Sequence, residues 1–314
     1  MPTMSIRAFL FTLLIGASLL NLASAGAQAE SGAAAPFLAA IAADEEGLGR
    51  SPQSRDRFFE PAGRPRACAL LLHGLNTEPA AMDCLARELA SQGVLVFRAA
   101  LAGHGGPRES WAAASSERWL SDAALAWRVV AARAKELAVP SLAVGFSLGA
   151  LVLVDLSHSD NSVRPDAFVL LAPATVLRPR VYLLHPLTAL GIAIASAAPR
   201  AYRSASVLPA KAYRAFFDLV DRAAGQPLPR FRPSLVFVDS EDFLVDAGAL
   251  TAAAAREREC RLVTIHSRGY VAGARHHLIL DIDSMGAEAW HTMTEELRSF
   301  VDGVAASGPR AQSP

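Results

Sequence analysis

The sequence predicts an α/β fold in which a mostly parallel β-sheet is flanked by helices and carries a helical lid insertion. Short, continuous apolar runs alternate with segments of helical periodicity, as in parallel sheets wound with helical crossovers. The pentapeptide Gly145-Phe146-Ser147-Leu148-Gly149 stands between one such run and the helical segment that follows it. An acidic loop and a histidine pair come later in the chain, each after another apolar run.

Six strands and four helices are expected from these patterns. The apolar runs predict strands at residues 67–72, 94–97, 141–144, 167–171, 234–238 and 260–265. Apolar residues at helical spacing predict helices at 79–91, 117–137, 148–156 and 287–304. Residues 30–63 are expected to be loop-like, apart from a short amphipathic stretch at 37–43.

Residues 174–233 interrupt the alternation with many prolines and several apolar helical pieces, which indicates an insertion, interpreted as a lid over the site. Within it, residues 181–198 lack a formally charged side chain. Three interpretations stay open for this stretch: a buried lid, a lid that lines an acyl pocket or dips into a lipid surface, and a membrane span. Pro186 and His185 would interrupt a span.

The composition limits the class of protein. With 314 residues, of which 52% are hydrophobic, the chain can form one large domain or two small ones and is not disordered throughout. Its 30 basic and 30 acidic residues balance, so nucleic acid is not expected as a partner. Lys135 and Lys211 are the only lysines, and neither is close to Ser147 in the sequence, as a Ser–Lys dyad signature would require.

The N-terminus has the pattern of a signal peptide at residues 1–25. Arg7 supplies a positive charge, residues 8–20 are apolar, and Ala23-Ser24-Ala25 fits a cleavage site. Export to the periplasm or the medium is therefore expected, with residues 26–314 forming the mature domain. An uncleaved anchor is the alternative, although the apolar run is shorter than the ~20 residues of a spanning helix.

Cofactor chemistry is not expected. The three cysteines do not form a disulfide framework, and no cysteine–histidine spacing resembles a metal site. Cys68 and Cys84 could be bridged after export, but the preferred interpretation is that they are small buried apolar side chains.

The pentapeptide is interpreted as a nucleophile elbow, a strand-to-helix turn that holds Ser147 in a strained conformation. A serine hydroxyl needs a base to accept its proton, and an imidazole needs a carboxylate to orient it. In this fold class the order is serine, acid, histidine, each at the carboxyl end of a strand.

Asp242 is the preferred acid because it lies a few residues beyond the predicted strand 234–238, whereas Asp239 is too close to the strand. His276 is preferred over its neighbour His277 as the base because it begins the segment that leads to the last helix.

Backbone N–H groups of Leu75 and Leu148 are the candidates for an oxyanion hole. Leu148 follows the nucleophile, and Leu75 lies in the loop after the first apolar strand. Gly74 is expected to let that loop turn, and His73 to hold it in place rather than to take part in chemistry.

With these residues in place, the chain resembles the serine hydrolases of the α/β-hydrolase fold, and is similar to the monoacylglycerol lipase, lysophospholipase and bacterial carboxylesterase group. The match is carried by Leu70–Leu75, by the Gly-His-Gly loop at 101–105, by Gly145–Gly149 and by Gly273-Ala274-Arg275-His276, with a Trp-x-x-Asp step at Trp119–Asp122. Ala99-Ala100 and Phe146 depart from the group's usual residues.

This resemblance implies hydrolysis of a carboxylic ester through an acyl-enzyme on Ser147, without metal or cofactor. The apolar insertion suggests a lipophilic substrate such as a monoacylglycerol or lysophospholipid, and contact with a lipid surface through the lid. Acyl transfer, amide or peptide hydrolysis, and a non-catalytic binding module of the same fold are the alternatives.

Overall fold

The computed structural model describes residues 32–310, apart from residues 161, 270, 272 and 274. The predicted signal peptide at residues 1–25 lies outside the described residues. Across the part of the chain that is described, none of the helices has the length and apolar character that crossing a membrane requires.

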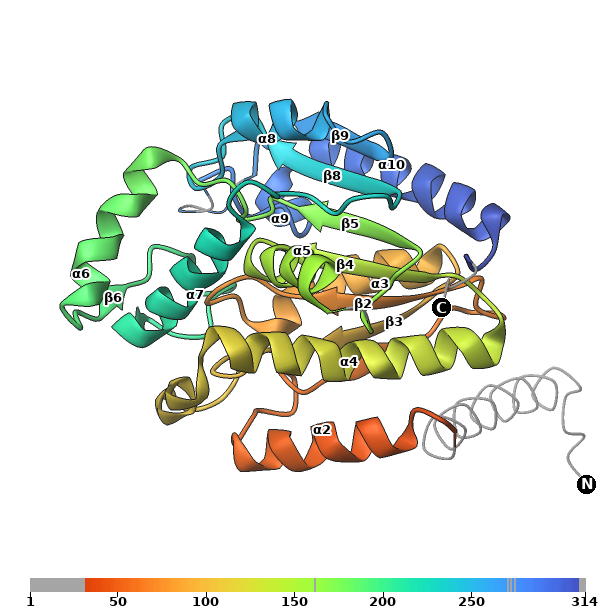
Figure 1. The fold of residues 1–314 in the computed structure, drawn as a ribbon, viewed down its shortest axis with the longest axis horizontal. Coiled ribbons are helices and arrows are strands. Elements are labelled where there is room, and N and C mark those ends of the chain that lie inside the picture. The colour runs from red at the N-terminus through yellow and green to blue at the C-terminus, as the bar shows by residue number, and fades with distance from the viewer. Residues whose placement is uncertain (1–31, 161, 270, 272, 274, 311–314) are drawn as a thin grey trace, which may run out of the picture.

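Seven strands form the central sheet in the order β1–β3–β2–β4–β5–β8–β9 (Figure 1). Only β1 runs antiparallel to its neighbour, β3; the other pairs are parallel, which confirms the predicted mostly parallel sheet. All six predicted strands are present. The edge strand β1 was not predicted, because three residues are too short to show alternation. The bounds are β1 Arg57–Phe59, β2 Ala67–Leu72, β3 Val94–Ala99, β4 Ser141–Phe146, β5 Ala167–Leu171, β8 Ser234–Asp239 and β9 Cys260–Ile265.

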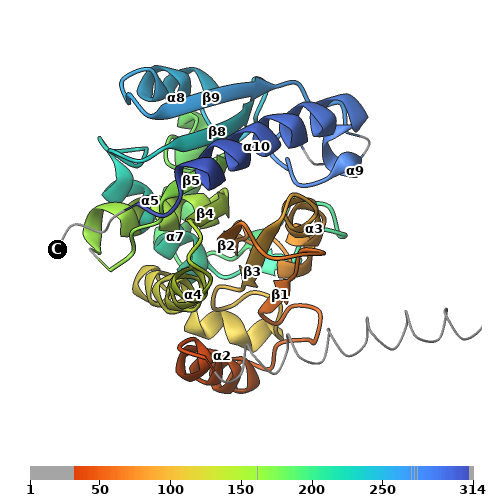
Figure 2. The same cartoon turned by 90° about the vertical axis from the view of Figure 1, so that its right-hand side faces the viewer.

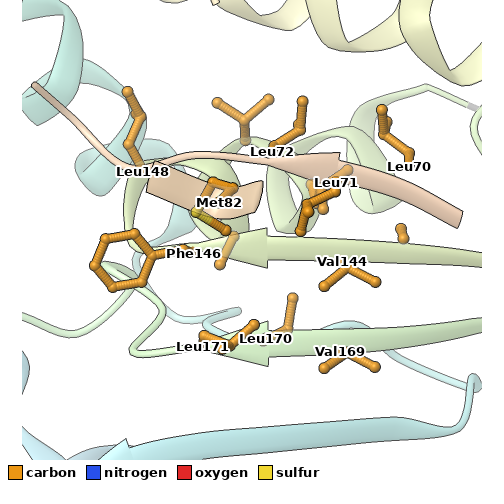
Figure 3. Close-up of a cluster of buried hydrophobic side chains, with 14 of the residues drawn as sticks. Leu70, Leu71, Leu72, Met82, Val144, Phe146, Leu148, Val169, Leu170 and Leu171 are labelled. Atoms are coloured by element: carbon orange, nitrogen blue, oxygen red, sulfur yellow. The ribbon is translucent and has the colours of Figure 1, made fainter. Parts of the chain in front are cut away.

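The five inner strands are buried along their whole length. Helices cover both faces of the sheet, so the inner strands consist of continuous apolar runs instead of alternating apolar and polar residues. Figure 3 shows the leucine, valine and phenylalanine side chains that β2, β4 and β5 contribute to this core. The buried core extends to the carboxyl ends of these strands, where it holds the loops of the site.

Helices α3 and α10 cover one face of the sheet, and α4 and α5 cover the other (Figure 2). Helix α4 begins after Ser115, whose side chain accepts a hydrogen bond from Arg118 N, and ends where Ala138 takes a left-handed conformation. The N-terminal stretch expected to be loop-like contains helix α2, which packs on α4. The bounds are α2 Ala35–Gly47, η1 Pro79–Met82, α3 Asp83–Ser91, η2 Arg108–Ala113, α4 Ser116–Leu137, α5 Leu148–Ser159, α8 Ala247–Ala254, α9 Ile282–Met285 and α10 Ala287–Ser307.

The insertion at residues 174–233 lies beyond the carboxyl ends of the strands (Figure 1). It contains the expected helical pieces and a two-stranded antiparallel ribbon that was not expected. The apolar stretch 181–198, for which a membrane span was one interpretation, is divided among three short elements. The bounds are η3 Pro179–Leu184, α6 His185–Ala189, β6 Ile194–Ala195, β7 Val207–Leu208 and α7 Ala210–Ala223.

The three cysteines are free thiols, so the bridge considered between Cys68 and Cys84 is not formed. Burial in β2 raises the pKa of the Cys68 thiol to about 12. Cys68 is therefore a small apolar core residue.

Candidate active site

Ser147 lies in a sharp turn between β4 and α5, with φ 50° and ψ −110°. This left-handed conformation is strained for a residue with a side chain. The flanking glycines permit the turn: a Cβ on Gly145 would lie 2.6 Å from Ala150 N, and one on Gly149 would lie 2.5 Å from Leu72 O. The geometry is that of a nucleophile elbow, as the pentapeptide predicted.

The imidazole of His277 joins Ser147 to Asp242. Its Nε2 lies 2.9 Å from Ser147 Oγ, and its Nδ1 lies 2.8 Å from Asp242 Oδ2. A carboxylate can only accept, so Nδ1 carries the proton and Nε2 is left to accept the serine hydroxyl. All three side chains are buried, and the ring of Phe146 packs against His277 with 5.2 Å between ring centroids. This is the arrangement that activates a serine hydroxyl.

Asp242 has the position expected for the acid. Its Oδ1 accepts hydrogen bonds from Leu244 N at 2.7 Å and Val245 N at 2.9 Å, which leaves Oδ2 for His277. The carboxylate is fully buried and fixed by the loop after β8. Asp239 is the last residue of β8, and its carboxylate accepts from Ser267 N and Glu241 N instead.

The choice of His276 as the base is corrected by this geometry. The His276 ring contacts Ser267 Oγ at 3.2 Å, Asp239 at 3.5 Å and Glu241 at 3.3 Å. Arg275 and His276 both have positive φ angles, 50° and 59°, and this tight turn precedes His277. The sequence places both histidines after β9 but contains no signal for these backbone angles, and so could not identify which ring points toward Ser147.

The candidate oxyanion donors are the backbone N–H groups of Leu75 and Leu148. Leu148 is the first residue of α5, and Leu75 lines the cavity that contains Ser147. Within the described residues, neither N–H donates to a protein acceptor. Gly74 allows its loop to lie close to the Phe146 ring, because a Cβ at this position would lie only 2.8 Å from ring atoms. Both donors are therefore available to a developing negative charge.

Two buried histidines connect the loop of Leu75 to the Gly-His-Gly loop. His73 Nε2 accepts from Leu101 N at 3.0 Å, and His104 Nε2 accepts from Asn76 N at 3.0 Å. Each imidazole thus holds the other's loop, and the ring centroids are 4.4 Å apart. Burial lowers the pKa of His73 to about 3 and that of His104 well below its usual value. Both rings are therefore neutral, as an acceptor nitrogen requires.

The Trp-x-x-Asp step, Trp119–Asp122, also holds the Gly-His-Gly loop. Trp119 Nε1 donates to Ala102 O at 2.9 Å, and Asp122 Oδ2 accepts from Ala102 N at 2.8 Å. Both backbone groups of one residue are thus fixed from a single helix, α4.

Asn76 ties the loop of Leu75 to the insertion, a contact that sequence reasoning missed. Its amide donates to Ser196 Oγ at 2.8 Å and Ala205 O at 2.9 Å, and it accepts from Ala205 N at 2.8 Å. The residue has a positive φ of 57°, which asparagine tolerates better than most residues. The only sequence signal was its position next to Leu75.

A cavity of about 340 Å³ opens between the sheet and the insertion, with Ser147 and His277 in its wall. Its lining is mostly apolar and comes largely from the insertion. The residues of the insertion that line it include Val181, Leu184, Ile194, Tyr213, Phe216 and Phe217. Among the described residues, no group of three or more histidine, cysteine or acidic side chains is arranged to hold a metal ion.

Residues 63–216 match the protein-family model described as serine aminopeptidase, S33. A comparison with curated proteins gave no match.

Solved structures share the fold at low sequence identity. The chain is similar to a soluble variant of monoglyceride lipase from Saccharomyces cerevisiae in complex with a substrate analogue, with a TM-score of 0.66, 12% identity, and 79% of this chain and 90% of that one covered. For one of the metagenome-derived lipolytic enzymes LipS and LipT, the TM-score is 0.62 and the identity 18%, covering 81% and 99%. For the monoacylglycerol lipase of Paleococcus ferrophilus, the TM-score is 0.57 and the identity 18%, with 78% of this chain and 98% of that one covered. The sheet, the elbow and the matched region agree with these likenesses, and the chain has the α/β-hydrolase fold.

Proposed function

We propose that this protein hydrolyses carboxylic esters with a lipophilic acyl group through an acyl-enzyme on Ser147. The observation that carries the proposal is the pair of contacts of His277, 2.9 Å to Ser147 Oγ and 2.8 Å to Asp242 Oδ2. With this base in place, Ser147 can lose its proton as it attacks the ester carbonyl.

In the proposed reaction, Ser147 Oγ forms a bond to the carbonyl carbon while His277 Nε2 takes the hydroxyl proton. Asp242 stabilises the resulting imidazolium, and the N–H groups of Leu75 and Leu148 stabilise the oxyanion. The bond to the alcohol oxygen then breaks, and His277 returns the proton to the departing alcohol. Water, deprotonated by His277, releases the acid and restores Ser147.

The apolar cavity supports an acyl chain as the bound group. Phenylalanine and aliphatic side chains remove water from a hydrocarbon chain, whose burial contributes about 0.8 kcal/mol per methylene. Monoacylglycerols and lysophospholipids are the substrate types that we favour.

Two measurements test the proposal. Labelling by a fluorophosphonate probe should occur in the protein and be absent in Ser147→Ala, and failure to label would exclude a serine hydrolase. Turnover of p-nitrophenyl esters of increasing chain length should rise beyond acetate. Activity on acetate alone would leave an esterase but remove the lipophilic substrate.

Amide hydrolysis is a second candidate because the matched family model is described as a serine aminopeptidase. An aminopeptidase needs an acidic group near the substrate's ammonium, and the described residues that line the cavity include no aspartate or glutamate. Esters are therefore favoured. Comparing p-nitroanilides of amino acids with p-nitrophenyl esters of fatty acids distinguishes the two activities. Transfer of the acyl group to an alcohol other than water would use the same acyl-enzyme.

Export and lipid-surface contact complete the proposal. The signal peptide pattern at residues 1–25 supports cleavage after Ala25, which N-terminal sequencing of the mature protein would detect. Large apolar side chains of the insertion are exposed: Tyr182, Leu183, Leu187, Leu190 and Ile192. We propose that this apolar surface contacts lipid that carries the substrate.

A further inference from the structure

The cavity wall contains a single arginine among mostly apolar residues. Of the described residues that line it, Arg275 is the only one with a formal charge apart from the titratable His277. The Arg275 side chain is exposed, which places its guanidinium at the opening of the cavity instead of in its apolar interior. A cation at the opening of an acyl-binding cavity requires a physical explanation.

A second guanidinium lies close to the first. The Cζ atoms of Arg180 and Arg275 lie 4.2 and 4.6 Å from the centroid of the Phe243 ring, which also lines the cavity. The two carbon atoms are therefore at most 8.8 Å apart, the sum of those distances. The ring holds both cations by cation–π contacts, but it does not neutralise their charge.

Nearby carboxylates are already engaged by the two histidines. Asp242 binds His277, while Asp239 and Glu241 contact His276. Within the described part of the chain, neither Arg180 nor Arg275 forms an ion pair with an acidic side chain. Arg180 donates instead to the neutral carbonyl of Phe243, and the guanidinium of Arg275 has no hydrogen-bond or ion-pair partner among the described residues.

The charge of the insertion reinforces this pair. Residues 174–233 contain nine arginines and lysines and two aspartates, whereas the whole chain has 30 basic and 30 acidic residues. The insertion is thus positively charged, whereas the rest of the chain, with 21 basic and 28 acidic residues, is negatively charged. Such a field attracts anions toward the opening.

We propose that Arg180 and Arg275 bind an anionic group, such as phosphate, on the alcohol portion of the ester substrate. This inference rests on the proposed function, since it takes the apolar cavity as the acyl site and Ser147 as the point of cleavage. An acyl chain inside the cavity leaves the alcohol portion of the ester at the opening. Arginine pairs well with phosphate oxygens because of its planar array of donors. The favoured substrate class is then a lysophospholipid with an anionic headgroup rather than an uncharged monoacylglycerol.

The test compares 1-dodecanoylglycerol with 1-dodecanoylglycerol 3-phosphate, which share an acyl chain and differ in charge. Wild-type protein should have the higher kcat/KM for the phosphate ester, and 0.5 M NaCl should reduce that preference. Arg275→Gln should lower kcat/KM for the phosphate ester about fivefold, and the double change with Arg180→Gln about tenfold or more, the range of exposed charge pairs. Neither change should alter kcat/KM for the neutral ester more than twofold.

Two further variants complete the design. Arg275→Lys keeps the charge and should retain most of the preference. Arg256→Gln removes an exposed arginine that forms no ion pair with another described residue and lies outside the cavity lining, so it should change neither rate. An equal loss on both esters in Arg275→Gln, or a wild-type preference that is absent or insensitive to salt, would overturn the anion site.

Measuring lipid binding without turnover distinguishes a failure of this inference from a failure of the proposed function. Calorimetric titration of Ser147→Ala with each lipid does not require turnover. Tighter binding of the phosphate ester that is lost on adding Arg275→Gln would support the anion site even if the protein hydrolysed neither lipid. Equal affinities for the two lipids would refute the site even if both were hydrolysed.

Discussion

His276 and His277 are consecutive residues whose rings contact two different aspartates. His277 Nδ1 lies 2.8 Å from Asp242, while His276 Nδ1 lies 3.5 Å from Asp239. Only the first pair extends to Ser147, through His277 Nε2. Replacing one or the other should therefore have different effects on catalysis, although the two side chains are chemically identical and adjacent in the sequence.

Replacing His277 with glutamine should lower kcat at least 10³-fold, because Ser147 loses the base that accepts its proton. Replacing His276 with glutamine should reduce kcat less than tenfold, since its contacts only hold the loop. Steady-state rates on p-nitrophenyl butyrate test both variants. If His276→Gln proved the more damaging, the assignment of the base would be wrong.

The two aspartates should differ in the same way. Asp242→Asn removes the charge that orients His277 and stabilises its imidazolium, so kcat should fall about 10³- to 10⁴-fold. Asp239→Asn leaves the Ser147–His277–Asp242 contacts intact and should retain kcat within about tenfold. Comparable losses in the two variants would contradict the assignment of Asp242 as the acid.

The elbow should not tolerate a side chain at Gly149. An alanine Cβ would lie 2.5 Å from Leu72 O and 2.7 Å from His73 O, both backbone atoms that cannot move away cheaply. Gly149→Ala should therefore lower the free energy of unfolding by about 3 kcal/mol or more. Gly303 in α10 has nothing within 4 Å of its Cβ position, so Gly303→Ala should raise it by about 0.5–1 kcal/mol. Urea denaturation measures the free energy of unfolding of both variants. If Gly149→Ala left it unchanged, α5 could move away from β2 to make room for the added methyl group.

His73 and His104 should make the protein less stable in acid. Burial lowers the pKa of His73 from 6.5 to about 3, so the unfolded chain takes up a proton that the folded protein does not. Stability is then lost as pH falls from about 6.5 toward 3, by roughly 1.4 kcal/mol per pH unit for His73, and His104, whose pKa is also lowered, adds a loss in the same direction. His73→Gln should reduce this slope by about one proton in urea titrations at several pH values. Unchanged slopes would show that the ring is protonated in the folded state.

The exposed apolar residues of the insertion should bind lipid vesicles. Leu183 and Leu190 are 72% and 77% exposed, so replacing both with serine should weaken binding about tenfold or more without loss of stability. Phe231 is 86% exposed but directly precedes β8, so it lies at the amino end of that strand, away from the carboxyl ends where Leu183 and Leu190 lie. Phe231→Ser is therefore the matched control. Vesicle sedimentation gives the measurement, and equal binding by all three proteins would exclude this surface. If the wild type bound no vesicles but formed a dimer in sedimentation analysis, a second copy would be the partner.

The amino-acid sequence by itself determined the parallel sheet, the elbow at Ser147 and the choice of Asp242 as the candidate acid, because these depend on local patterns. Continuous apolar runs mark strands buried on both faces, and Gly145 and Gly149 mark a close approach of helix and strand. The acid followed from its distance to the end of a strand.

Only the tertiary structure decided which histidine faces Ser147, because ring direction follows from the left-handed turn at Arg275 and His276, which no sequence period encodes. It also brought Arg180 and Arg275, which are 95 positions apart in the numbering, to the ring of Phe243. Contacts of this kind depend on where loops from different strands meet, and sequence spacing does not fix that geometry.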